Sequence, residues 1–254
     1  VIYFQGASGD IKEATINKAD VQNEGGVKES IDFSKSSSEA AKNGEIMAQN
    51  VADSLKNSEF TPILESEIKA KTKTMSLPLQ KLPDIDNIKK LINDPDSAPV
   101  IKEWATMICS RYEKTSVPSI LEMEVQFIKI GEKLNLITFP AEPVTSLGQK
   151  LKTLTKAPLS TLILGYTNGL FSYLPDDFTI QEGGYEPQSS SYYYMLPSLF
   201  NLGTESEIVD KVNESISEVE KSSNVYGNFH HISEKNRKAF FTLLPLSGNI
   251  LYNN

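Results

Sequence analysis

Hydrophobic and polar positions follow a helical period along much of the chain. Apolar residues spaced three and four apart predict a helix over about 40–55, behind a serine-rich cap. The same spacing predicts two further helices over 85–93 and 98–114. It also predicts a helix over 143–154, which begins at a proline, and a last one over 205–221.

Other segments have the patterns of strands. Residues 65–77 alternate and are rich in threonine and lysine, which predicts a half-exposed strand. Strands over 121–130 and 133–139 are expected to be joined by a tight hairpin at Gly131 and Glu132, and the short apolar run 161–165 is typical of a central strand. Because helices and strands alternate, we predict an α/β (or α+β) fold with a mixed sheet flanked by helices.

The first residues, VIYFQGASGDIK, have two interpretations. The run from Tyr3 to Gly6 is similar to what a protease leaves of a purification tag. Alternatively, residues 1–4 form a buried strand that runs into a glycine turn over residues 6–10. We favour the second interpretation, which implies that the chain starts inside a domain.

Composition limits the chemistry that the chain can perform. The formal net charge is -8 and the lysines are dispersed, which argues against nucleic-acid binding. Cys109 is the single cysteine, so a disulfide framework is excluded, and no stretch approaches the ~20 apolar residues of a transmembrane segment. The two histidines, His230 and His231, are adjacent and cannot assemble a convincing catalytic triad. An enzyme would therefore use carboxylates, tyrosines or residues outside this chain.

Three motifs follow predicted strands or glycine turns. They are TFPAEP with Glu142, GYTNG with Asn168, and EGGYE with Tyr185, the last followed by a serine and tyrosine run that contains Tyr192. Ligands of open α/β sheets bind where strands end, and paired glycines let the backbone approach closely. Taken singly, each motif also has a structural explanation. The carboxylate of TFPAEP can be a charge at a helix N-terminus, the Asn-Gly pair can be a turn, and the tyrosine run can be packed aromatic residues.

The order and spacing of these motifs, FPAEP, GYTNGLFSYLP and GGYE, resemble the catalytic region of the neutral/alkaline ceramidase family. LPLQKLP at residues 77–83 is also similar to that family. The resemblance covers residues 1–222 and implies that they are the C-terminal part of a ceramidase-like catalytic domain. Residues 223–254 have no counterpart and would be an extension of unknown role.

The resemblance implies a zinc-dependent hydrolase of an amide (N-acyl) or related acyl bond in a small molecule or lipid. Glu142 and Tyr185 would be zinc ligands, and an N-terminal part of the same domain, outside this chain, would supply two histidine ligands. Tyr192 matches a family tyrosine that contacts substrate or an oxyanion. Family members are commonly secreted or periplasmic, so that location is expected.

The glycine turn departs from the family at one position. The family has a serine at the active centre where this chain has Lys12, so Lys12 and Tyr192 are the catalytic candidates. Gly9, Asp10 and Asn168 are expected to contact substrate. Lys12 also leaves an alternative open, in which the protein is a degenerate family member that acts as a non-catalytic binding or scaffold protein.

Overall fold

The structure, a computed structural model, describes residues 3–11, 33–58, 67–113, 115–132 and 134–222. These residues fall into two units, one formed by residues 3–11 with 67–222 and the other by residues 33–58. Lys12, the two histidines and the predicted extension over 223–254 lie outside the described residues.

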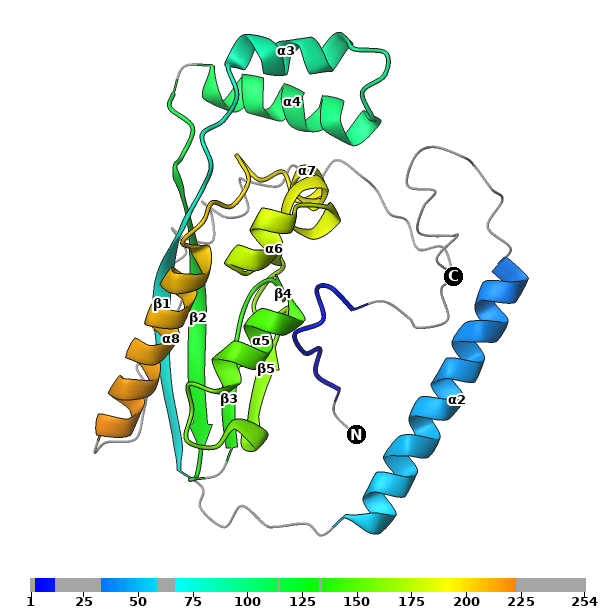
Figure 1. Cartoon of the computed structure of the whole chain (residues 1–254), viewed down its shortest axis with the longest axis vertical. Helices are drawn as coiled ribbons and strands as arrows, with labels where there is room; N and C mark the ends of the chain where they lie inside the picture. The colour runs from blue at the N-terminus through cyan, green and yellow to red at the C-terminus, as the bar shows by residue number, and fades with distance from the viewer. Residues whose placement is uncertain (1–2, 12–32, 59–66, 114, 133, 223–254) are drawn as a thin grey trace. The chain divides into compact units, whose positions relative to one another are not determined.

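The larger unit is built on a four-stranded sheet with the order β1-β2-β3-β5 (Figure 1). Strand β1 (Ile68–Pro78) pairs antiparallel with β2 (Ile120–Ile130), and β2 pairs antiparallel with β3 (Leu134–Thr138). Strand β5 (Thr161–Leu164) is parallel to β3, so the sheet is mixed. The predicted fold class, a mixed sheet flanked by helices, is confirmed.

One face of this sheet forms the main core. Helices α5 (Thr145–Lys152) and α8 (Thr204–Lys221) pack against it because alternate strand residues point to the same side. The core joins buried side chains of the strands and both helices: Met75, Leu77, Met123, Val125, Phe127, Ile137, Leu147, Leu151, Ile163, Ile208, Val212 and Ile216. Further along β1, Lys71 and Lys73 lie on this same face and form ion pairs with Glu218 of α8. Such exposed pairs add little stability.

A helical hairpin is inserted between β1 and β2. Helix α3 (Ile85–Asn93) is capped by the Asp84 side chain, which accepts a hydrogen bond from the Asp86 amide at 2.8 Å. Helix α4 (Pro99–Tyr112) begins at a proline, whose fixed φ suits a first helical turn. The two helices share a small core of Ile88, Trp104, Ala105 and Ile108, against which Cys109 is partly buried. The apolar spacing thus predicted this pair correctly.

Several short elements of the larger unit were not predicted by the sequence pattern. Two-residue strands β4 (Glu142–Pro143) and β6 (Tyr173–Leu174) pair in parallel. Helix α6 (Asp177–Glu182) is followed by a π-helical turn (Tyr185–Ser189) and by helix α7 (Ser190–Tyr193). Each is too short to show a period in its sequence.

The predicted opening strand is wrong for the part that the structure describes. Tyr3 and Phe4 form no strand, and their side chains are 74% and 55% exposed. The glycine turn after them is nevertheless integrated into the larger unit. The Gly165 amide donates to the Gln5 carbonyl at 3.0 Å, and the Gly9 amide donates to the Pro143 carbonyl at 2.9 Å.

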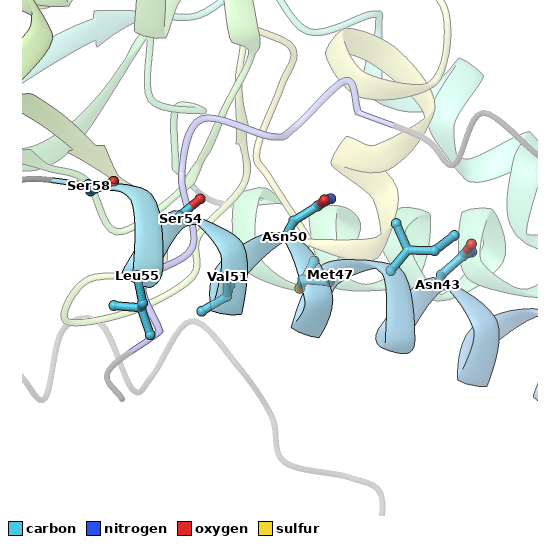
Figure 2. Close-up of a pocket in the computed structure, with 8 residues that line it drawn as sticks. Asn43, Met47, Asn50, Val51, Ser54, Leu55 and Ser58 are labelled. Atoms are coloured by element: carbon cyan, nitrogen blue, oxygen red, sulfur yellow. The ribbon is translucent and has the colours of Figure 1, made fainter.

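The smaller unit consists of helix α2 (Phe33–Asn57), which begins earlier than the predicted start near residue 40. Ile46, Met47, Val51 and Leu55 are exposed along it, and Figure 2 shows several of them beside asparagine and serine side chains on successive turns. The helix is therefore amphipathic, as its spacing predicted. Among the residues that the structure describes, no helix is long and apolar enough to cross a membrane.

Gly9 gives a first test of how closely the glycine turn packs. A methyl group there would lie 2.7 Å from the Glu142 carbonyl oxygen and 3.1 Å from that of Pro143, and backbone atoms yield little. We expect Gly9→Ala to lower the free energy of unfolding by about 1–3 kcal/mol in urea denaturation. Gly6→Ala is the control, because its methyl would meet only the Ile163 oxygen at 3.9 Å. Equal stability of the two variants would contradict the close packing.

Asp176 links α6 to α5 and gives a pH-dependent test. Burial alone raises the pKa of this carboxyl, but hydrogen bonds from Ser146 and from the Thr179 amide and hydroxyl outweigh burial and lower the pKa below 3.8. Because the folded-state pKa is depressed, the stabilisation is present above about pH 4 and is lost as the pH falls through the folded-state value.

Replacement of Asp176 by alanine should therefore cost about 1–2 kcal/mol at neutral pH through the lost helix cap. The difference in unfolding free energy between wild type and Asp176→Ala should shrink between pH 4 and pH 2 in urea titrations. Asp210→Ala, at an exposed position on α8, serves as the control. A difference that is constant with pH would rule out the depressed pKa.

Candidate functional site

Glu142 lies at the edge of the sheet where the parallel strands β3 and β5 both end. Its amide donates to the Ser172 carbonyl at 2.9 Å, and the β4–β6 register sets it beside Tyr173. On the other strand, the Tyr166 amide donates to the Ala141 carbonyl at 3.1 Å. The half-buried carboxylate is thus held at the edge where ligands of open α/β sheets bind.

Tyrosine side chains surround this carboxylate. The Tyr194 hydroxyl donates a hydrogen bond to Glu142 Oε1, and the hydroxyls of Tyr166 and Tyr173 interact with the same carboxylate. The Tyr173 ring centroid lies 6.0 Å from that of Tyr194 and 5.9 Å from that of Tyr185, both in edge-on arrangements. We call Glu142 with Tyr166, Tyr173, Tyr185 and Tyr194 the tyrosine cluster.

Three phenols of the cluster, those of Tyr166, Tyr173 and Tyr194, are protonated at neutral pH. Burial raises the pKa of Tyr173 to about 12, and the negative charge of Glu142 adds to the effect. Burial and then the Glu142 carboxylate also raise the pKa of Tyr166 and of Tyr194 above the ordinary value of 10.0. These three residues are therefore neutral donors that face an acceptor, as a partly buried carboxylate requires.

Tyr185 reaches the cluster through an unusual backbone. Gly183 and Gly184 precede it with φ angles of 72° and 103°, a region that other residues rarely adopt. The π-helical turn then begins at Tyr185, and such turns are frequent at functional sites. Glu142 and Tyr185, the two predicted zinc ligands, are thus brought into one cluster, with Tyr173 in contact with both.

Three consecutive tyrosines, the last two residues of α7 and its C-cap residue Tyr194, have different surroundings. Successive helical residues are rotated by about 100°, so three neighbours cannot share one contact. The Tyr192 ring packs edge-on against Trp104 at 5.1 Å, in the small core of the helical hairpin. Tyr193 is 60% exposed, and Tyr194 bonds to Glu142. The predicted catalytic tyrosine, Tyr192, thus packs in a different cluster, and Tyr194 is the residue that contacts Glu142.

The predicted substrate contacts have structural partners here. Gly9 is buried against β4, and the Asp10 carboxylate accepts bonds from the Thr145 amide at 2.7 Å and hydroxyl at 2.6 Å, which caps α5. Asn168 is exposed, has a φ of 63°, and its amide group lies 3.5 Å from Gln126 Oε1. Lys12 lies outside the described residues.

Three members of the cluster were not predicted from the sequence. Tyr166 and Tyr173 lie within GYTNGLFSYLP, and the parallel edge could have indicated Tyr166, since it follows the end of β5 directly. The position of Tyr173 beside Glu142 depends on the two-residue pairing of β4 with β6, which the sequence pattern does not predict. Tyr194 depends on the rotation of α7.

The donor atoms of the cluster fit part of a zinc site. Zinc accepts carboxylate oxygens, and the charged or phenolic oxygens of Glu142 and Tyr185 are donors of that hard type. Among the residues that the structure describes, there is no group of three or more histidine, cysteine, aspartate and glutamate side chains that could hold a metal ion.

Gly184 tests the backbone that delivers Tyr185. A methyl group there would meet no atom within 4 Å, so Gly184→Ala changes only backbone strain at a φ of 103°. We expect the free energy of unfolding to fall by about 1–3 kcal/mol. Gly44→Ala, which also points into open space but lies inside helix α2, should instead be neutral or raise helix stability by about 0.5–1 kcal/mol. If both substitutions are neutral in urea unfolding, the positive φ is not required.

The chain was also compared with known proteins. No protein-family model matches it, and no curated protein matches it either. The functional interpretation therefore depends on the geometry of the tyrosine cluster and on the motifs in the sequence.

Proposed function

We propose that this chain belongs to a ceramidase-like, zinc-dependent hydrolase that cleaves an amide (N-acyl) or related acyl bond. The observation that carries the proposal is that Glu142 and Tyr185 lie in one cluster at the carboxyl edge of the sheet, where both contact Tyr173. The two residues are 43 positions apart by their numbers, and the resemblance of their motifs to the neutral/alkaline ceramidase family assigns both of them to the metal.

In this proposal Glu142 and Tyr185 hold the zinc together with two histidines from an upstream part of the same domain. A bound zinc supplies a Lewis acid and lowers the pKa of its water to about 7. The chain's own residues orient the carboxylate, and the residues that flank Glu142 in the sequence are withdrawn from water. Ala141, Pro143 and Val144 are buried there.

The substrate class in this proposal is a small molecule or lipid that carries an N-acyl group, with a sphingolipid as the example that the family resemblance favours. Exposed aromatic side chains lie near the carboxylate, since Tyr166 is 43% and Tyr185 36% exposed. Aromatic rings suit contacts with apolar chains. A secreted or periplasmic location forms part of the same proposal.

A second candidate function is non-catalytic binding. The observation that favours it is Lys12, which stands where the family has its active-centre serine. In this case the protein would be a degenerate family member that keeps the fold and acts as a non-catalytic binding or scaffold protein. Release of fatty acid from an N-acylated sphingoid base by the zinc-loaded protein separates the two candidates, since hydrolysis excludes the second and binding without hydrolysis supports it.

Zinc content tests the proposal directly. The full-length protein that contains this chain should hold about one zinc ion, and Glu142→Ala should remove most of it, because one of four ligands is lost. Metal analysis after exhaustive dialysis measures both values. Circular dichroism verifies that the variant is folded, and Glu142→Gln replaces it if the alanine variant is not.

The control for the zinc measurement is Glu182→Ala, which removes an exposed carboxylate at the end of α6. It should leave the zinc content unchanged. A wild-type protein without zinc, or a Glu142→Ala protein with full zinc, would contradict the proposed function.

A further inference from the structure

Tyr194 is held on Glu142 by contacts that come from outside its own short helix. The indole Nε1 of Trp104, on α4, donates to the Leu196 carbonyl at 2.8 Å, two residues after Tyr194. Two residues before it, the Tyr192 ring packs on Trp104. One side chain of the inserted hairpin therefore fixes the backbone on both sides of Tyr194, and Figure 1 shows the hairpin next to α7.

The backbone at this point is strained. Met195 has a φ of 52°, a left-handed conformation that is uncommon for a residue with a long side chain. The Leu196 amide donates to the Ser191 carbonyl at 3.0 Å, and the Tyr194 amide donates to the Ser190 carbonyl at 3.2 Å. With the Met195 amide, which donates to the Tyr192 carbonyl at 3.2 Å, these bonds form a Schellman cap that ends α7 and holds Tyr194 at the C-cap position.

The adjacent residue, Tyr193, has a different environment from Tyr194. Tyr193 has the same side chain on the same helix, yet it is 60% exposed and its ring faces Tyr185 at 6.3 Å. Tyr194, by contrast, is half-buried, and its hydroxyl donates a hydrogen bond to a Glu142 carboxylate oxygen. A bond to an ionised group is stronger than a neutral one and fixes the acceptor's orientation.

We propose that Tyr194 is a positioning residue that orients the Glu142 carboxylate, and that the α3–α4 hairpin seats Tyr194 through Trp104. The carboxylate then presents a fixed face to a ligand at the sheet edge. The part of this proposal that concerns zinc rests on the proposed function, whereas the contact between Tyr194 and Glu142 does not.

The contact is tested without metal by a double-mutant cycle in this chain. Tyr194→Phe and Glu142→Ala, singly and together, are compared by urea unfolding in the presence of a chelator. The unfolding equilibrium constant of the double variant should differ from the additive expectation by about 10- to 100-fold, the range for a hydrogen bond to a charged group. Tyr193→Phe with Glu142→Ala is the matched control and should be additive. Additive behaviour of the Tyr194 pair would overturn the proposal whatever the zinc content.

The role of that contact is tested by zinc affinity in the full-length protein, measured by competition with a chromophoric chelator. Tyr194→Phe should weaken zinc binding about 10- to 100-fold, as partners of metal ligands typically do, and Tyr193→Phe should leave it unchanged. Trp104→Phe should weaken binding as well, whereas Tyr112→Phe, on the same helix and in the same small core, should not.

The outcomes separate the two proposals. If wild type binds zinc, Glu142→Ala abolishes binding and Tyr194→Phe has no effect, the positioning role is wrong and the proposed function stands. If wild type binds no zinc but the cycle shows coupling, the proposed function is wrong and Tyr194 still orients Glu142. Equal zinc affinity of Trp104→Phe and Tyr112→Phe would overturn the part assigned to the hairpin.

Discussion

The parallel pairing of β3 with β5 is the constraint on which the candidate site depends. Thr138 and Leu164 are partners at the ends of the two strands, so both chains leave the sheet at the same edge. The pairing continues past the strands, because the Phe139 amide donates to the Leu164 carbonyl at 2.9 Å and the Thr167 amide donates to the Phe139 carbonyl at 2.9 Å. A slip of one residue would turn every side chain of β5 to the other face and would separate Tyr166 from Glu142.

A carboxylate that is partly withdrawn from water needs donors, and the site supplies them as phenols. The phenols bond to Glu142, and its negative charge adds to burial in raising the pKa of Tyr166, Tyr173 and Tyr194. Within the cluster, the negative charge of Glu142 therefore faces the neutral phenols of Tyr166, Tyr173 and Tyr194. A cation bound there would reverse this balance, since it stabilises a phenolate as well as the carboxylate.

The sequence was a good guide where a regular pattern was long enough to repeat. The spacing of apolar residues located α3 with the observed bounds and placed β2, α4 and α8 within one or two residues of the structure. It was wrong for the opening residues, because Tyr3 and Phe4 are apolar enough for a strand but stay exposed. It could not show β4, β6 or the π-helical turn, which are short and are held by tertiary pairing. Its motifs pointed to Glu142 and Tyr185, which both contact Tyr173. They also pointed to Tyr192, which packs on Trp104, since a run of three tyrosines does not reveal which one turns toward the sheet.

The backbone and the carboxylate of Glu142 are positioned by different parts of the structure, which explains why an inserted hairpin would contribute to the site. The sheet fixes the backbone of Glu142 through β6, but a glutamate side chain has three rotatable bonds and its carboxylate is not placed by its Cα. Orientation therefore requires a side-chain partner. That partner, Tyr194, is the C-cap residue of a four-residue helix and is followed by a left-handed residue, Met195. A helix of that length does not hold its own position. Trp104 supplies what the helix lacks, because the α3–α4 hairpin has a core of its own and presents its indole to a carbonyl just beyond Tyr194. The orientation of the Glu142 carboxylate then depends on Trp104, which is far from Glu142 in sequence and acts on it through Tyr194.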